Sequence, residues 1–206
     1  MEKEINNNGY DYVDLGLPSG TLWSTCNVGA KKPSDYGLYF QWGDTKGYKK
    51  KQVGKDDGQK MFSWNDYKWN PNGDGKTFSK YTTRGAALNL ENDAAHINMG
   101  DDWHIPSYEQ IKELIDNTTS TWLESSDVNG RLFTSKKDAS KSIFIPATGV
   151  ALDGSIILSG KYGYVWSANL YMRGAYGSQC LIFGSEDSGL DGESRFYGLP
   201  VRGVIG

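Results

Sequence analysis

The chain has 206 residues, of which 26 are glycine and 13% are aromatic, and its formal net charge at pH 7 is -3. This length suffices for one domain with its own hydrophobic core, and the acidic balance excludes the basic surface by which proteins bind nucleic acid. No run of about 18 apolar residues is present, which excludes direct membrane insertion by a helix.

The first 83 residues predict a hairpin, a short strand and a long loop. Residues 12–17 and 21–28 carry strand-type patterns on either side of a Pro-Ser-Gly turn, as in a β-hairpin. Residues 37–43 are a short apolar segment bounded by glycines. Residues 45–83 are rich in Lys, Gly, Asp and Asn, which predicts a long surface excursion. Its anchors to the core are expected to be Phe62, Trp64, Tyr67, Trp69 and Phe78.

Two helices are predicted in the middle of the chain. Over residues 90–99 apolar side chains recur at helical spacing and Gly100 follows as a stop signal. The residues that set this spacing are Leu90, Ala94 and Ile97. Ser107 and Gln110 form a capping-box pattern at the start of the second helix. Its apolar face is expected to carry Tyr108, Ile111, Leu114 and Ile115.

The following segment predicts several short strands. Each is a run of branched or aromatic residues near turn-forming residues such as Asn129-Gly130 and Asp153-Gly154. These strands are expected at residues 131–134, Ser142–Pro146, 156–158 and 162–166. Trp122 and Leu123 are expected to form a short buried segment. Helices in the first half and strands in the second indicate one domain of the α+β class over residues 1–206.

The last quarter of the chain mixes core-type apolar residues with varied polar ones. Residues 180–184 alternate like a strand with one buried face, which would carry Leu181 and Phe183. Residues 185–194 consist mainly of Gly, Ser, Asp and Glu, and are expected to form a surface loop. Residues 197–205 predict a closing strand.

Several phrases of the sequence resemble one family, and they span nearly the whole chain. They are YVDLGLPSGTLWSTCNVGA (12–30), YGLYFQWGD (36–44), ENDAAHINMGDDWHIPSYEQIKELI (91–115), SIFIPATGVALDGS (142–155), YGYVWSAN (162–169) and SRFYGLPVRGV (194–204). Together they resemble the Fibrobacter succinogenes major paralogous domain, which is abundant in surface proteins of Bacteroidales.

This family resembles the C-type lectin fold as elaborated in formylglycine-generating enzymes and in the variable proteins of diversity-generating retroelements. The resemblance implies a C-type-lectin-like fold in which a terminal β-ribbon joins the N- and C-terminal strands. It also implies two helices and a second, small antiparallel sheet whose exposed strands and loops bind ligands.

Catalytic functions find little support in the sequence. An oxidoreductase of the formylglycine-generating type would need two C-terminal thiols, but of the cysteines Cys26 and Cys180 only the latter lies there. Whether these two cysteines are free is left open, since they can pair in an oxidising compartment. His96 and His104 are expected to be packed or surface residues, and no Gly-x-Ser-x-Gly motif is present. A non-catalytic protein without a cofactor is therefore expected.

Two places in the sequence partly match calcium-binding motifs. Residues 70–75 copy the first half of an EF-hand loop, but the twelfth position is Tyr81 instead of a bidentate glutamate. Trp64-Asn65-Asp66 spells a tripeptide that many calcium-dependent sugar-binding lectins carry on a late strand, whereas here it lies in the excursion. No metal site is therefore expected.

The candidate binding site is the polar face of the C-terminal segment. Aromatic, guanidinium and acceptor groups cluster there, and such groups carry recognition energy when they lie together. Composition alone favours a merely solvated strand face with loops, and the family resemblance shifts the balance towards binding. The candidate ligand-binding residues are Asn169, Tyr171, Arg173, Tyr176, Gln179, Glu186, Asp187, Asp191, Glu193 and Phe196.

The predicted function is that of a surface or secreted, adhesin-like module that binds a protein or glycan on another surface. The polar start of the chain, MEKEINNNGY, has no apolar leader, so an extracellular location would require that a leader precedes it and is removed. Two alternatives are a retroelement-diversified receptor-binding protein and a formylglycine-generating-type oxidoreductase. Adenine mutagenesis of an Asn-type codon yields many residue types found in this segment, but it cannot yield Met172, Gln179, Glu186 or Glu193.

Overall fold

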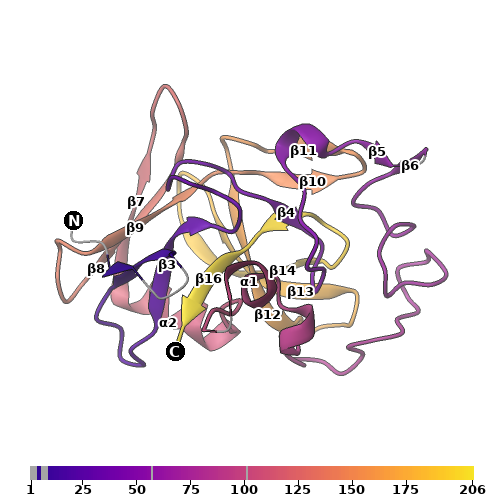
Figure 1. Cartoon of the computed structure of the whole chain (residues 1–206), viewed down its shortest axis with the longest axis horizontal. Coiled ribbons are helices and arrows are strands. Elements are labelled where there is room, and N and C mark those ends of the chain that lie inside the picture. Colours follow the sequence, from indigo (N-terminus) through magenta and orange to yellow (C-terminus); the bar gives the residue numbers. More distant parts are fainter. Residues whose placement is uncertain (1–3, 6–8, 57, 101) are drawn as a thin grey trace.

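The computed structural model describes residues 4–5, 9–56, 58–100 and 102–206. Within these residues the chain is mostly β, with two short α-helices and several small sheets, which confirms the α+β class in general terms (Figure 1). The helical segments are η1 (Lys50–Gln52), η2 (Leu90–Asn92), α1 (Ala94–Met99) and α2 (Tyr108–Asn117). The strands of the first half are β1 (Glu4–Ile5), β2 (Asp11–Asp14), β3 (Leu22–Asn27), β4 (Tyr39–Phe40), β5 (Lys55–Asp56) and β6 (Gln59–Lys60). Those of the second half are β7 (Thr118–Leu123), β8 (Gly130–Ser135), β9 (Ser142–Pro146), β10 (Val150–Leu152), β11 (Ser155–Ile157), β12 (Gly163–Leu170), β13 (Gly177–Phe183), β14 (Ser188–Ser194), β15 (Leu199–Pro200) and β16 (Arg202–Ile205).

The first sheet joins the two ends of the described chain. Its order is β1-β2-β3-β16, and β2 with β3 forms the hairpin that the sequence predicts. The closing strand β16 pairs antiparallel with β3, with Val204 opposite Trp23 (Figure 1). Buried Arg202 reinforces this pairing, because its guanidinium donates to Asn27 Oδ1 at 2.9 Å and to the Ser24 carbonyl at 3.0 Å. Of the polar N-terminal run MEKEINNNGY, residues 1–3 and 6–8 lie outside the described residues.

The second sheet has the order β12-β13-β14 and corrects two predictions. Residues 188–194, expected within a surface loop, form strand β14 and pair with the whole of β13. As an edge strand it needs no apolar face, so its Gly- and Ser-rich sequence gave no strand signal. Strand β13 is buried on both faces instead of one, because Cys180 packs into one core cluster and Leu181 into another.

Both predicted helices are present, and the α-helical part of the first begins later than predicted. The capping box of α2 is confirmed: Ser107 Oγ accepts from the Gln110 amide at 3.1 Å, and Gln110 Oε1 accepts from the Ser107 amide at 2.9 Å. The α-helical part of residues 90–99 begins only after Asp93, whose carboxylate caps it. Leu90 and Ile97, which helped to set the predicted helical spacing, are both exposed. The residues of α1 that are buried are Ala94, Ala95 and Met99.

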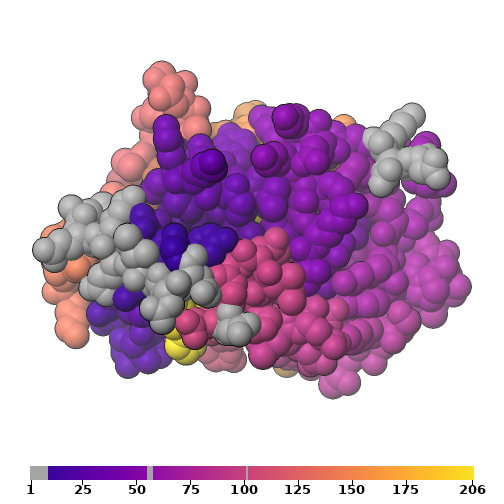
Figure 2. Space-filling view, viewed as in Figure 1, coloured from indigo at the N-terminus to yellow at the C-terminus, as the bar shows by residue number. Residues whose placement is uncertain are grey.

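The excursion over residues 45–83 is anchored by aromatic side chains, as predicted. Phe62, Tyr67 and Trp69 are buried, and Trp64 and Phe78 pack against the same core cluster as the latter two. In Figure 2 this excursion occupies the right-hand part of the visible face, where little of the yellow C-terminal segment reaches the surface. The excursion therefore covers part of the core and belongs to the body of the domain.

The remaining strands form a sheet β7-β8-β9 and a hairpin β10-β11. The turn at Asp153-Gly154 is confirmed, with φ values of 47° and 75°. The predicted buried segment at Trp122 and Leu123 is wrong, since these residues end β7 and Leu123 is exposed. Period-two alternation along β7 turns successive side chains to opposite faces, so Trp122 packs partly against a core cluster while Leu123 points away from it.

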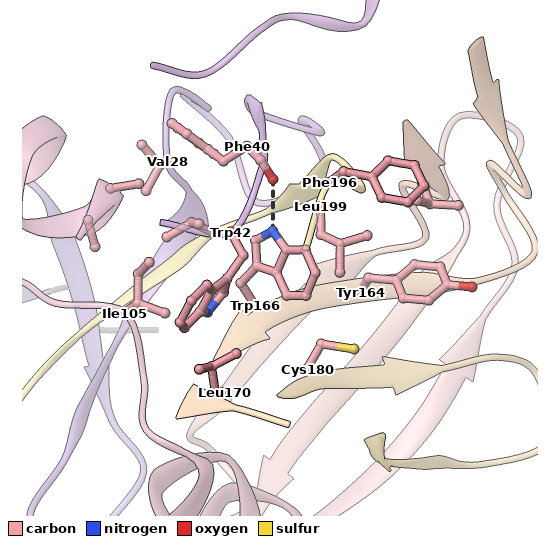
Figure 3. Packing of buried hydrophobic residues seen from close by; sticks show 14 of the residues in the cluster. Val28, Phe40, Trp42, Ile105, Tyr164, Trp166, Leu170, Cys180, Phe196 and Leu199 are labelled. Carbon is pink, nitrogen blue, oxygen red and sulfur yellow. Dashed lines mark hydrogen bonds between the residues drawn. The ribbon is translucent and has the colours of Figure 1, made fainter. Parts of the chain in front are cut away.

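The larger core cluster lies between the excursion, α1 and the second sheet (Figure 3). Indole groups lock it to the backbone: Trp166 Nε1 donates to the Phe40 carbonyl at 2.8 Å, and Trp42 Nε1 donates to the Ser167 carbonyl at 2.9 Å. Phe196 belongs to this core with 9% of its surface exposed, so the expectation that it is displayed is wrong. Its ring packs 4.5 Å from that of Trp64, between centroids.

Candidate functional site

A cleft of about 510 Å³ lies where the end of β12 meets the start of α2. It brings together five of the ten predicted site residues, which are Asn169, Tyr171, Arg173, Gln179 and Asp191. The other residues that line it are Gly85, Tyr108, Glu109, Leu170, Met172 and Leu190. The cleft therefore brings together half of the predicted residues; Tyr176 lies outside its lining in the loop between β12 and β13, and the other four lie elsewhere.

Tyr171 is held against the sheet by two glycines. Gln179 on β13 pairs across the ladder with Gly192 on β14, so both positions lie on the same face of the sheet. A methyl group on Gly192 would lie 2.4 Å from the Tyr171 ring, which means that the ring occupies the space that a side chain would fill. A methyl group on Gly177 would also contact this tyrosine, at 3.5 Å. The ring thus forms a wall of the cleft beside Gln179.

The amide side chain of Asn169 joins three segments that line the cleft. Its Oδ1 accepts from the backbone amide of Tyr108 at 2.8 Å, and its Nδ2 donates to the Gly85 carbonyl at 3.3 Å. These bonds tie β12 to the first turn of α2 and to the loop at Gly85. Asn169 therefore shapes the cleft, and most of its hydrogen-bonding capacity is used within the protein.

Charges of both signs line the cleft. Tyr171 Oη donates to Asp191 Oδ1 at 3.2 Å, and the same carboxylate oxygen accepts from the Gly192 amide at 2.7 Å. Partial burial, followed by the nearby Asp191 carboxylate, raises the pKa of Tyr171, which keeps the phenol protonated. The Arg173 guanidinium stacks 5.9 Å from the centre of the Tyr171 ring. Within the described part of the chain Arg173 has no carboxylate partner, so its donors are available to a ligand.

The loop between β12 and β13 extends the cleft with exposed apolar side chains. Met172 is 61% exposed and Tyr176 is 48% exposed. Sequence reasoning placed Tyr176 in the site but missed Met172, Tyr108 and Glu109. Tyr108 was assigned to the apolar face of its helix, and no local pattern links α2 to residues 169–173, because their meeting is a tertiary contact.

Glu186 and Asp187 lie in a different hollow of about 540 Å³, which Trp122 and Tyr162 also line. Buried Arg131 holds this loop from below, because its Nη1 donates at 2.6 Å to the carbonyls of Gly184 and Asp187. The two carboxylates are thus exposed on a firmly held loop, apart from the cleft.

Glu193 is partly buried, and neither described cavity includes it among its lining residues. Burial, with a smaller contribution from Asp191, raises its pKa to about 7. Burial, followed by the nearby Glu193 carboxylate, raises the pKa of Tyr164 and of Tyr197. Glu193 is therefore better described as a partly buried group of the scaffold that binds a proton near neutral pH than as an exposed hydrogen-bond acceptor for a ligand.

Neither the two cysteines nor the calcium-like loop is arranged for catalysis or metal binding within the described residues. Cys26 and Cys180 are free thiols on different sheets, and complete burial raises the pKa of Cys180 well above its ordinary value. In residues 70–75 Asp74 closes the turn, accepting from the backbone amides of Lys76 and Thr77 at 2.8 and 2.9 Å. These bonds lower the pKa of Asp74 to about 2. Among the described residues, no cluster of three or more His, Cys, Asp or Glu side chains is arranged to hold a metal ion.

Comparison of the chain with protein-family models, with curated proteins and with solved structures finds no match. Across the described residues, none of the helices has the length and apolar character that a bilayer crossing requires.

Proposed function

We propose that the protein is a non-catalytic binding module of C-type-lectin-like fold, displayed on a cell surface or secreted, and that the cleft between β12 and α2 is its recognition site. The observation that carries the proposal is the combination of Tyr171, Met172 and Arg173 around one cavity on a firmly built sheet. Aromatic residues, methionine and arginine are the types enriched where proteins bind partners.

The fold proposal rests on the arrangement of the elements. The pairing of β3 with β16 corresponds to a terminal ribbon, and β12, β13 and β14 form a small antiparallel sheet near the C-terminus. Two helices precede this sheet in the chain. These features agree with the resemblance to the Fibrobacter succinogenes major paralogous domain, and through it with surface proteins of Bacteroidales.

The proposed mechanism is complementarity on a rigid support. Tyr171 is fixed by Gly177 and Gly192, so little side-chain freedom is lost when a ligand packs against it. Arg173 supplies unpaired donors, while Glu109 and Asp191 supply acceptors. A partner that presents both kinds of charge fits this lining better than a polyanion, which two carboxylates would repel.

Diversification of the binding segment by a retroelement is a second candidate function, favoured by where the chemically diverse residues of this segment lie. Tyr171 and Arg173 belong to one loop between two paired strands, where substitution leaves the core untouched. Sequencing the neighbouring DNA tests this candidate, which requires a reverse transcriptase gene beside a near-copy of the 3′ end.

The oxidoreductase alternative is less favoured. Burial disfavours the Cys180 thiolate, and only the thiolate is a nucleophile. Turnover of a cysteine-containing peptide that Cys26→Ser with Cys180→Ser abolishes would establish this alternative against the proposal.

The test of the proposal is binding of the purified chain to arrays of glycans and surface proteins. Arg173→Ala is expected to weaken each array interaction at least about tenfold, the loss typical of a central contact residue. Lys32→Ala removes the same charge at an exposed position outside the cleft and serves as the matched control. Equal binding by the two variants, or peptide turnover by the wild type, would refute the proposed function.

A further inference from the structure

The side chain of Gln179 is an unpartnered polar group in the wall of the cleft. Gln179 is only 6% exposed and lines the cavity. Among the described residues, no protein group forms a hydrogen bond with its carboxamide, although its neighbours Asn169, Tyr171 and Asp191 are all hydrogen-bonded. The carboxamide atoms are not among the fully buried side-chain atoms that lack a partner in the described residues, so they face the cleft and the water in it.

The position of Gln179 on strand β13 shows that a polar side chain interrupts an apolar row. Side chains two residues apart lie on the same face, so Gln179 continues the row formed by Leu181 and Phe183. Those two residues pack in a core cluster with Ile111 and Leu114 of α2. A leucine at position 179 would extend this apolar row, whereas the glutamine places a donor and an acceptor at the end of the row, in the cleft.

An unpaired carboxamide selects for a specific kind of ligand group. Any group that enters must replace the hydrogen bonds that cavity water gives to the amide, or lose binding free energy. The carboxamide offers one acceptor oxygen and two donor hydrogens, so a ligand needs a donor and an acceptor side by side. In an extended peptide, the N–H and C=O of one residue point to the same side and meet this requirement.

We propose that the cleft takes an extended polypeptide segment of a partner protein, with the N–H and C=O of one residue paired to the Gln179 carboxamide. This inference rests on the proposed function and specifies the ligand of the same site.

The surroundings of the cleft favour a polypeptide over a saccharide. Met172 and Tyr176 extend apolar area beyond the cavity, where neighbouring side chains of an extended segment would pack. Arg173, Glu109 and Asp191 provide charges of both signs, which suits the mixed side chains of a protein. A neutral saccharide brings no charged group that would pair with Arg173, Glu109 or Asp191.

The experiment uses small probes and the ¹⁵N-labelled full chain. N-acetylglycine N-methylamide carries the required N–H and C=O on its glycyl residue. Its ester analogue, 2-acetoxy-N-methylacetamide, has an oxygen in place of that N–H. The third probe is methyl α-D-glucopyranoside. We expect the diamide to shift the Gln179 side-chain signals and the Gly192 amide signal in a saturable manner, and the ester to do so at least about fivefold more weakly.

The variant Gln179→Met keeps the side-chain length and removes the carboxamide. It is expected to abolish the probe-induced shift at Gly192 and to leave the melting temperature within about 2 °C of the wild-type value, because the amide has no protein partner to lose among the described residues. An unchanged melting temperature shows that a loss of binding does not come from misfolding. A fall in melting temperature would instead show that Gln179 supports the fold, and the inference would be wrong.

The other outcomes separate this inference from the proposed function. Equal shifts by the diamide and the ester, or shifts by the glucopyranoside alone, would overturn the polypeptide assignment while the cleft remained a binding site. If no probe shifts any cleft signal and Arg173→Ala binds the arrays like wild type, both the inference and the proposed function are refuted.

Discussion

Arg195 and Tyr67, 128 residues apart in the chain, meet in the core, where Arg195 Nε donates to Tyr67 Oη at 2.8 Å. The guanidinium also donates to the carbonyls of Tyr81, Ala175 and Lys80, and it lies against the rings of Trp42, Tyr67, Trp69 and Phe78. One buried cation therefore ties the excursion to the segment that follows β14.

The first prediction concerns this tie. Burial raises the pKa of Tyr67, so the phenol stays protonated, accepts from Arg195 and donates to the Trp42 carbonyl at 3.0 Å. Tyr67→Phe is expected to lower the free energy of unfolding by about 1.5–3 kcal/mol, the usual loss for a hydrogen bond to a charged group. Urea unfolding measures this loss, with exposed Tyr176→Phe as the control that should change stability little. Similar values for the two variants would show that the contact contributes nothing.

The second prediction is a pH dependence of stability that Glu193 causes. The folded-state pKa of about 7 lies above the ordinary glutamate value of 4.5, so the folded protein binds more protons than the unfolded chain between these pH values. The free energy of unfolding should therefore fall as the pH rises from about 4.5 to 7, through the Glu193 contribution. Glu193→Gln should remove this part of the slope in urea unfolding at pH 5 and pH 8. Exposed Glu124→Gln is the control, and a Glu193→Gln variant with the wild-type slope would disprove the assignment.

The third prediction uses two glycines of one strand. Gly192→Ala forces the Tyr171 ring out of its position, whereas a methyl group at Gly189 meets no atom within 4 Å. Gly192→Ala is expected to cost about 1–3 kcal/mol, as for other overpacked sites, and to weaken ligand binding. Gly189→Ala should leave both nearly unchanged. The measurements are thermal unfolding and titration with N-acetylglycine N-methylamide. A Gly192→Ala variant with wild-type stability and wild-type binding would contradict the placement of the Tyr171 ring.

The fourth prediction separates scaffold from display within the C-terminal segment. Phe196→Ala should lower the free energy of unfolding by about 3–5 kcal/mol, because its ring is buried against Trp64 and 4.7 Å from Tyr197, between centroids. Tyr176→Ala, at an exposed position of the β12–β13 loop, should change stability by less than about 0.5 kcal/mol. Chemical denaturation of both variants checks this prediction. If Phe196→Ala is as stable as the wild type, the Phe196 ring does not belong to the core and is exposed to ligands.

Local signals in the sequence predicted the elements that depend on local contacts. The α2 helix follows from its capping box and from Ile111 and Leu114, and the β2–β3 hairpin follows from its turn. Strand β14 was missed because an edge strand obtains its backbone bonds from β13 and keeps polar side chains. Helix α1 is shorter than its apolar spacing indicated, since the α-helix begins only after Asp93, whose side chain caps it.

The cleft was only partly predictable for a similar reason. Tyr171, Arg173 and Asp191 were recognised from residue type, but Tyr108 reaches them through a hydrogen bond to a residue 61 positions away. Gln179 was assigned to display, although period two places it on the buried face with Leu181. That alternation was the available signal for its burial, and only the structure shows that its amide has no protein partner among the described residues.

The pairing of β3 with β16 also determines when the polypeptide can fold. During translation, β3 is synthesised long before its partner strand β16. The acceptors on Asn27 and Ser24 have no bond to the Arg202 guanidinium until that residue has been made. Formation of the first sheet therefore requires a search over segments that are far apart in the chain, which slows folding. A ribosome stalled near residue 200 would hold a chain with a bare strand edge, which makes such nascent chains natural clients of chaperones.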